Sequence, residues 1–585
     1  MRLRSLATAG TSLLLLAGSL AAAHAAGSSA APALPTTRLD AKALASRADK
    51  KHAPAFKVGF AKELLDPNPA DVEAGTVHLG GYGLFPTRPT DGPLIAPDGT
   101  PEHLYVRAMA VENAQGDVLM LAGLENQGTF AAYKQCACGI WDMRQQVVAD
   151  LNKAHPGLNM AEQDIVVNAD HSHSGPDLIG LWGGVPIRYL KLVHDQTVKA
   201  LEEAFEHRLP ANLFAGDSRP VMPTPEVGGY ISGSATPGED LVHSQFDKDS
   251  VTGHDDHAVD TELRVLEAVT PDGDVLGTLV NYAAHATITG SGNRGYSADW
   301  PGWVARKTEE AIRSASAGDA GLERKAVDPI AVTMVADVGR SQPPRPNTDS
   351  RCGTVGHPSC DSDGLDTYSR IMLPFVTDAM AKAQPVRGST VKSSEVFTRE
   401  AGTNAALLGV SYSGYLPANG YGAYRAGTPP WLTGHVIGTF VSSHRIGDQL
   451  LTAAPGEAYP DIRFGVERSV SGSAHTFTFG LANDQLGYLI APTSEYPWAT
   501  ASKPGNDNSL FNVSATYGDH VTCSQTSTAV AVGFTATGET MPYGPDANPP
   551  ACAGYTASDM APMGPSPQGP WPFGDPPTPA SPATP

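Results

Sequence analysis

Two histidines separated by one residue end a strand-like run of the sequence, VVNADHSHSGPD, at positions 166–177. In a β-strand the side chains of residues i and i+2 point to the same face, so His171 and His173 would face one space if the strand continues through them. Imidazole is both a common zinc ligand and an acid–base group near neutral pH. The pair therefore indicates a metal or acid–base site, and two loop histidines bonded to backbone are the alternative interpretation.

A third histidine, His285, follows a second apolar run, VLGTLVNYAAH. Two strands that each end in an imidazole provide the rigid support that a zinc site needs, and a carboxylate commonly completes such a site. Glu457 in LLTAAPGEAYPDI is the carboxylate candidate, and Tyr488 in LANDQLGYLIAPTSEYP offers a phenol. The alternatives are a solvated turn for the glutamate and half-buried packing for the tyrosine.

A second group of possible ligands stands in the segment GHDDHAVD, which contains His254, Asp255, Asp256, His257 and Asp260. No apolar run leads into this polar stretch. We interpret it as a solvated loop, with a peripheral cation site as the alternative.

The elements that would position these residues are interleaved strands and helices. Residues 103–125 and 261–290 each contain two β-rich runs joined by a Gly-Asp turn, which predicts two hairpins. Further strands are predicted within 330–338 and 475–484.

Apolar residues at three- and four-residue steps predict a helix over 189–209. Helices are also expected over 301–315 and 365–383, and Pro374 should kink or break the last of these. Strands alternating with helices indicate an α/β architecture with a mixed β-sheet core and flanking helices.

The two ends of the chain have compositions unlike the middle. Residues 1–25 have a basic start, an apolar stretch and a small-residue end, which is the layout of a secretory signal peptide. We expect a flexible leader over 26–55, a folded catalytic body over 56–555 and a Pro-rich disordered tail over 556–585. The protein is therefore expected to be secreted, without a transmembrane segment.

The chain is acidic, with a formal net charge of −21 at pH 7. Loss of the two arginines of the signal peptide would make it −23. Such a surface repels phosphate backbones, so nucleic acid is not an expected partner.

Six cysteines in an exported chain are compatible with disulfides. The predicted pairs are Cys352 with Cys360 and Cys523 with Cys552. Cys136 and Cys138 are assigned structural or disulfide roles, with a zinc half-site as the alternative.

Taken in order, these motifs resemble the catalytic domain of the neutral, non-lysosomal ceramidases. HSHSGPD is similar to the family's His-Thr-His-Ser-Gly-Pro motif, and the AAHAT segment, the PGE turn and the ND-x-x-GY segment follow at comparable positions. The resemblance implies one Zn²⁺ held by His171, His285, Glu457 and Tyr488. It places His173 beside the reacting group as a catalytic residue, where it helps to handle the scissile amide.

Three features depart from the family. Gly339, in VADVGRSQPP, stands where the family has a serine treated as catalytic; Ser341 lies two residues on. Arg340 is new here and is either a contact for an anionic substrate or a surface residue. The family's Asn-Arg-Ser segment has no match, Arg219 being the nearest basic residue, and we expect no C-terminal immunoglobulin-like domain.

The sequence thus favours a secreted zinc-dependent amidohydrolase that acts on ceramide or a related N-acyl, lipid-like compound, or on an ester. A small amphipathic substrate is the expected partner. A non-catalytic zinc-containing binding protein of the same fold is the second hypothesis. A serine hydrolase using Ser341 has little support, because no G-x-S-x-G elbow is present.

Overall fold

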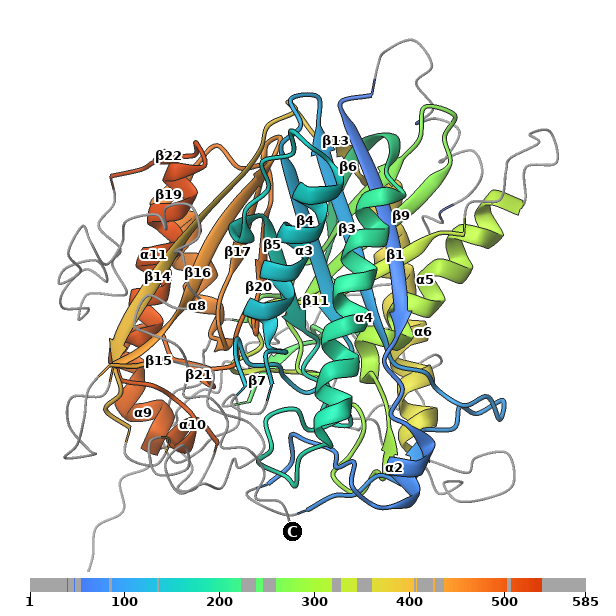
Figure 1. Ribbon diagram of the computed structural model, residues 1–585, viewed down its shortest axis with the longest axis vertical. Coiled ribbons are helices and arrows are strands. Elements are labelled where there is room, and N and C mark those ends of the chain that lie inside the picture. The colour runs from blue at the N-terminus through green and yellow to red at the C-terminus, as the bar shows by residue number, and fades with distance from the viewer. Residues whose placement is uncertain are drawn as a thin grey trace, which may run out of the picture.

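Two β-sheets packed face to face form the centre of the molecule, with helices on their outer sides (Figure 1). The computed structural model describes residues 54–83, 87–133, 136–222, 238–245, 259–317, 328–344, 360–404, 424–426, 436–501 and 507–538, together with Leu39, Arg47 and Leu407. The mixed α/β class predicted from the sequence is confirmed. The predicted leader, body and tail boundaries stay predictions, although Arg47 of the leader is buried and pairs with Glu267.

The large sheet has the strand order β11-β9-β8-β6-β1-β3-β4-β5, and β13 pairs with β6. Its strands are β1 (Phe56–Leu64), β3 (Tyr105–Asn113), β4 (Val118–Leu124), β5 (Ile165–Ala169), β6 (Leu209–Ser218), β8 (Leu263–Val269), β9 (Val275–Tyr282), β11 (Ile330–Val335) and β13 (Gln384–Pro385). Both predicted hairpins are present, as the antiparallel pairs β3–β4 and β8–β9.

The twist of this sheet brings together the ends of strands that are far apart in it. Six neighbouring strand pairs lie between β5 and β9 in the sheet, and five of these pairs are antiparallel. Strands β5 and β9 therefore run in opposite directions within the sheet. At roughly 20–25° of twist per step, six steps rotate a strand by roughly 120–150°. The C-terminal ends of β5 and β9 can therefore lie at one end of the molecule, and β11 packs across β3, β4 and β5.

The second sheet has the order β14-β16-β17-β20, with β15 paired to β16. Its strands are β14 (Val391–Ala401), β15 (Tyr424–Ala426), β16 (Val436–Ile446), β17 (Gln449–Ala453) and β20 (Thr476–Phe479). An apolar core between the sheets includes Leu121, Val166, Met334, Phe477 and Phe479. The predicted strand over 475–484 is confirmed only for its first half, because Leu481 and Asn483 adopt positive φ and turn the chain.

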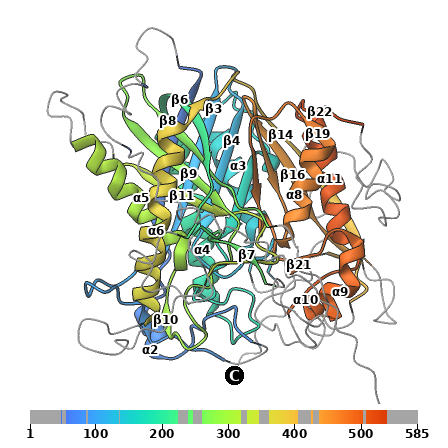
Figure 2. The same cartoon turned by 180° about the vertical axis from the view of Figure 1, so that it is seen from behind.

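Helices cover the outer faces of both sheets, as Figures 1 and 2 show from opposite sides. Helices α3 (Ile140–Ala154), α4 (Ile187–Glu206), α5 (Asp299–Ala317) and α6 (Cys360–Lys382) all lie on the face of the large sheet that is turned away from the second sheet. Helices α3 and α4 cover its β1–β5 half, and α5 and α6 cover its β6–β11 half. The second sheet is covered by α8 (Pro460–Ser469) and α11 (Tyr517–Ala531). Short helices are α2 (Pro69–Glu73), α9 (Tyr496–Ala501), α10 (Asp507–Leu510) and the 3₁₀ turns Glu162–Asp164 and Thr493–Glu495.

Helix α6 runs unbroken through Pro374, so a break at this proline is excluded, and the alternative prediction of a kink stays a prediction. Proline costs a helix one backbone hydrogen bond. The flanking side chains Ile371, Met372, Phe375 and Val376 are buried against the sheet and α5, and their packing offsets that loss. Among the helices of the described part, none combines the length and the apolar character that crossing a membrane requires.

One disulfide joins two of the described cysteines. Cys136 and Cys138 form a disulfide with an S–S distance of 1.99 Å, which favours the disulfide role over a zinc half-site. Cys523 is buried in α11. Cys352 and Cys552 lie outside the described residues, so their pairings stay predictions.

Candidate metal centre

The two histidines of the HSH motif lie together, although not for the reason that the strand pattern suggested. Strand β5 ends at Ala169, and His171 has a φ of 61°, so the strand does not continue through the motif. The chain turns because the amides of Asp170 and Ser172 bond to the carbonyls of Leu124 and Asn126 after β4. The two imidazoles still meet, with 3.3 Å between His173 Nε2 and His171 Nε2.

His285 reaches the same place from the other half of the large sheet. Strand β9 ends at Tyr282, three residues before it, and the His285 amide bonds to the carbonyl of Ser341. The ring centroids of His171 and His285 are 4.9 Å apart. One nitrogen from each of the three histidines lies within 4.8 Å of the other two, and all three side chains are buried.

Glu457 joins the histidines from the second sheet. After β17 the chain turns at Pro455 and Gly456 and forms a two-residue strand, β18 (Glu457–Ala458), parallel to β21 (Tyr488–Leu489). Its Oε2 atom is 3.4 Å from His171 Nε2 and 3.2 Å from His285 Nε2. We refer to His171, His173, His285 and Glu457 as the histidine cluster.

Tyr488 is placed beside this cluster by backbone pairing. Its Cα is the register partner of Glu457, and its amide bonds to the carbonyl of Phe511. The side chain is buried with Tyr459 and Ile490. The fourth residue of the ligand set implied by the resemblance is therefore adjacent to the third, and its role as a ligand stays a prediction.

Hydrogen bonds to backbone fix the orientation of two of the imidazoles. His171 Nδ1 donates to the carbonyl of Gln127 at 2.8 Å, and His285 Nδ1 donates to the carbonyl of Ser341 at 3.2 Å. In their neutral forms both rings then carry a lone pair on Nε2, and both lone pairs face Glu457 Oε2. Three electron-pair donors that face one another are repulsive unless a cation lies between them.

A zinc ion fits this donor set. Ligands bound at 2.0–2.2 Å in a tetrahedron are about 3.3–3.6 Å from one another. The separations of 3.2 and 3.4 Å between Glu457 and the two histidines agree with this edge length. Carbonyl groups that accept from the far nitrogen of each ring are the usual outer support of metal-binding histidines.

Burial and charge act together on the titration of the cluster. Burial alone would raise the pKa of Glu457, but positive charge on His171 and His285 and their hydrogen bonds to the carboxylate, present when those rings are protonated, outweigh it and hold that pKa well below its usual range. A metal cation at the same point would act in the same direction. Burial, together with His171 and His285, lowers the pKa of His173 well below that of a free imidazole. Neutral His173 beside ionised Glu457 is the state in which both can use their lone pairs.

The residues around Gly339 do not provide a serine for the site. A Cβ atom on Gly339 would lie 2.5 Å from the Glu457 carbonyl oxygen and 2.8 Å from that of Ala458, so β18 occupies the space of a side chain here. Ser341 is buried, and its hydroxyl donates to the Asp337 carbonyl at 3.2 Å. Its contribution to the histidine cluster is its own carbonyl, which orients His285.

Arg340 is not a surface residue, so that interpretation of it is wrong, whereas a contact with an anionic substrate stays a prediction. It is buried, its Nη2 is 2.8 Å from Asp461 Oδ2, and its guanidinium lies 5.3 Å from the Tyr459 ring centroid. Arg219 is exposed and pairs with Asp240 at 2.6 Å.

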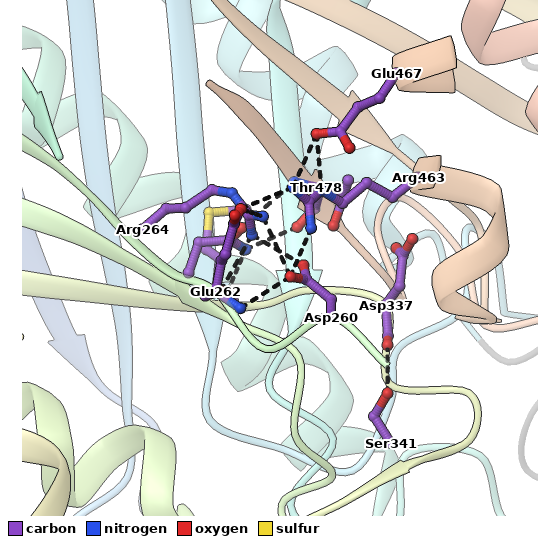
Figure 3. A network of polar contacts seen from close by, with 10 residues as sticks. Asp260, Glu262, Arg264, Asp337, Ser341, Arg463, Glu467 and Thr478 are labelled. Carbon is purple, nitrogen blue, oxygen red and sulfur yellow. Dashed lines mark hydrogen bonds and ion pairs between the residues drawn. The ribbon is translucent and has the colours of Figure 1, made fainter. Parts of the chain in front are cut away.

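A second group of charges, here the arginine network, consists of the buried residues Asp260, Arg264 and Arg463 and the exposed Glu262 (Figure 3). Asp260 accepts from Arg264 at 2.9 Å and lies 2.6 Å from Arg463 Nη1. The interpretation of Asp260 as part of a solvated loop is therefore wrong, because two guanidinium groups neutralise it inside the protein. His254 to His257 lie outside the described residues.

Three residues near the cluster were not identified from the sequence. Gly81 lies against the His173 ring, where a Cβ would come within 2.4 Å of Cγ, and Tyr82 contacts that ring edge-on at 4.8 Å between centroids. Buried Arg88 donates to the carbonyls of Gly80, His173 and Asn293. Only the glycines of LGGYG give any signal of close packing in the sequence.

Two solved structures with a similar fold are described as ceramidases. The neutral ceramidase from Pseudomonas aeruginosa aligns with a TM-score of 0.57 and 17% identity over 82% of this chain and 75% of that chain. A second structure, described as a ceramidase complexed with C2, aligns with a TM-score of 0.58 and 16% identity over the same shares. No protein-family model and no curated protein sequence matches the chain. At these identities the likeness establishes the fold.

Proposed function

We propose that the protein is a secreted, zinc-dependent hydrolase of an amide bond in ceramide or a related lipid-like N-acyl compound. The observation that carries the proposal is the convergence of two oriented imidazole lone pairs and the Glu457 carboxylate on one buried point. The ceramidase-like fold supports the same class of reaction and of substrate.

In the proposed site His171, His285 and Glu457 hold the zinc, and Tyr488 is the further ligand that the resemblance implies. Bound zinc supplies activation of a water molecule and polarisation of the carbonyl group under attack. The carbonyls of Gln127 and Ser341 keep the protons of the two histidines on Nδ1. Glu457, ionised at neutral pH, supplies the negative charge that balances part of the metal charge.

His173 is the residue that handles the scissile bond. Its pKa is lowered by burial and by the neighbouring histidines, so the ring is neutral when substrate arrives. A neutral imidazole next to the metal can take up a proton and pass it to the departing nitrogen. Gly81 and Tyr82 pack against the ring and hold it in place.

Incubation of the purified protein with N-acyl sphingoids, N-acyl amino acids and simple esters, with and without a chelator, tests this proposal. We expect turnover of at least one N-acyl compound that the chelator abolishes and added zinc restores. Absence of chelator-sensitive turnover on every compound would contradict it. For the proposed export, the secreted protein should begin at Ala26, which mass spectrometry of the culture medium measures.

A non-catalytic, zinc-containing binding protein is the second candidate, because Gly339 stands in place of the family serine. It predicts zinc and bound lipid without product. A measurable rate that His171→Ala abolishes while the protein stays folded would rule it out. Ser341 orients His285 through its backbone carbonyl, which alanine retains, so the Ser341→Ala variant should stay active.

A further inference from the structure

A buried carboxylate of the large sheet has its counter-charge in the leader segment. Glu267 of β8 is fully buried and lies between Phe214 of β6 and Thr278 of β9 in the strand register. Its Oε2 atom accepts from Arg47, and its Oε1 atom has no hydrogen-bond partner among the described residues. Within the part of the chain that the structure describes, Arg47 is therefore the only residue that bonds to this carboxylate.

The surroundings of Arg47 suit a guanidinium group. Helix α6 packs on β6 and β8 (Figure 2), and its Met380 carbonyl accepts a second N–H of Arg47. The guanidinium carbon also lies 5.2 Å from the centroid of the Phe214 ring, and the side chain is only 6% exposed. A carboxylate, a carbonyl and an aromatic face match the charge, the N–H groups and the flat face of a guanidinium. The contacts therefore form a specific site for an arginine.

Leu39 gives the leader a second point of attachment to the same region. Its side chain is buried in the apolar core that the large sheet forms with α5 and α6. That core also contains Phe214 and Met380, which are the neighbours of Arg47. Both described residues of the leader are thus buried against one part of the folded body.

The ionised form of Glu267 depends on Arg47. Burial raises the pKa of Glu267 to about 7 even with the arginine beside it, and among the described residues Arg47 alone acts against burial. Removal of one partner of a buried ion pair is strongly destabilising because the other charge stays buried without compensation, whereas replacement of both partners by neutral groups costs much less. Loss of Arg47 alone should therefore cost more stability than loss of Arg47 and the Glu267 charge together.

We propose that the leader is a strap docked on the site formed by β6, β8 and α6, with Arg47 as its anchor, and that the folded body depends on this strap for stability. The occupant of the site is then the protein's own segment before β1. The strap contacts neither the histidine cluster nor its supporting carbonyls, so this proposal does not rest on the proposed function.

Cleavage after Arg47 by an arginine-specific protease tests the docking in the full chain. The reference is a free peptide of residues 36–55, and mass spectrometry follows the initial rate of cleavage of the Arg47–Ala48 bond at pH 8, where Glu267 is ionised. Because cleavage requires the strap to open, we expect the wild-type rate to be at least about 100-fold below that of the peptide. A wild-type rate within threefold of the peptide would overturn the proposal.

The Glu267→Gln variant connects the protection to the carboxylate. It removes the charge that holds Arg47, so the bond after Arg47 should be cut about 10-fold faster than in the wild type. Glu310→Gln is the matched control, because Glu310 is an exposed carboxylate of α5, and it should leave the rate unchanged. Equal rates in Glu267→Gln and Glu310→Gln would overturn the role of Arg47 as the anchor.

Urea unfolding of the full chain at pH 8 gives a second readout. Arg47→Met should lower the unfolding midpoint, and Arg47→Met/Glu267→Gln should recover at least half of that loss, because no buried charge is then left without a partner. Arg313→Met, which removes an exposed pair with Asp328, should leave the midpoint nearly unchanged. Equal midpoints for wild type and Arg47→Met, or no recovery in the double variant, would overturn the proposal. If a variant does not fold, the cleavage rates of wild type and peptide decide.

Discussion

The histidine cluster and the arginine network both hold buried titratable side chains, with Glu262 as the exposed member of the network, and they differ in how their charges are satisfied. In the arginine network each carboxylate of Asp260 and Glu262 is met by the guanidinium groups of Arg264 and Arg463. In the histidine cluster acceptors face acceptors, because the protons of His171 and His285 point away to carbonyls. The first group is complete within the protein, whereas a cation from outside would complete the second.

The largest expected effect comes from breaking the histidine cluster. His171→Ala should lower turnover by about 1,000-fold or more, since the zinc loses an oriented ligand. It should change the stability of the metal-free protein little, because it removes one of the facing lone pairs. Steady-state kinetics and urea unfolding without metal measure the two effects.

His155→Ala is the matched control, because that histidine is exposed and pairs with Glu206. It should leave activity unchanged. Equal losses of activity in His155→Ala and His171→Ala would contradict the assignment of the site.

Disrupting the arginine network should lower stability rather than turnover. Arg264→Met leaves Asp260 buried with one partner fewer, so the free energy of unfolding should fall by about 3–5 kcal/mol. Arg313→Met removes an exposed pair with Asp328 and should cost under about 1 kcal/mol. Urea unfolding measures both values, and similar losses for the two variants would contradict the comparison.

Restoring the family serine should not improve the enzyme. Gly339→Ser places a side chain against the Glu457 carbonyl, so overpacking should lower the free energy of unfolding by about 1–3 kcal/mol. Gly292→Ser, where a Cβ meets nothing within 4 Å, is the control and should be tolerated. An increase in turnover for Gly339→Ser would show instead that the missing serine limits catalysis.

The smallest effect concerns Asp337, which lies beside the arginine network (Figure 3). Burial raises its pKa to about 7. A raised carboxyl pKa favours the folded state when the group is protonated, so its contribution is full at low pH and is lost as pH rises through about 7. Between pH 6 and 8 the wild type should lose about 1 kcal/mol more stability than Asp337→Asn. Parallel curves for the two proteins would exclude this role.

The sequence was sufficient to identify the members of the histidine cluster. Each of them follows an apolar run, and the strand formed by that run places it at one end of the molecule. The sequence could not identify the carbonyls of Gln127 and Ser341 as the groups that orient the histidines. Every residue has a carbonyl, and only the tertiary structure brings these two next to the imidazoles. Asp260 was misread for a related reason: its partner Arg463 is about 200 residues away in the chain. For Pro374, the local helix propensity of proline indicated a break, but the packing of the flanking side chains keeps the helix continuous.

The zinc content of the purified protein tests the central claim most directly. Elemental analysis of the wild type should give about one zinc per chain, and the double variant His171→Ala/His285→Ala should give almost none while staying folded. Equal zinc contents in the two proteins, or no zinc in a wild type supplied with it, would contradict a metal centre built from His171, His285 and Glu457.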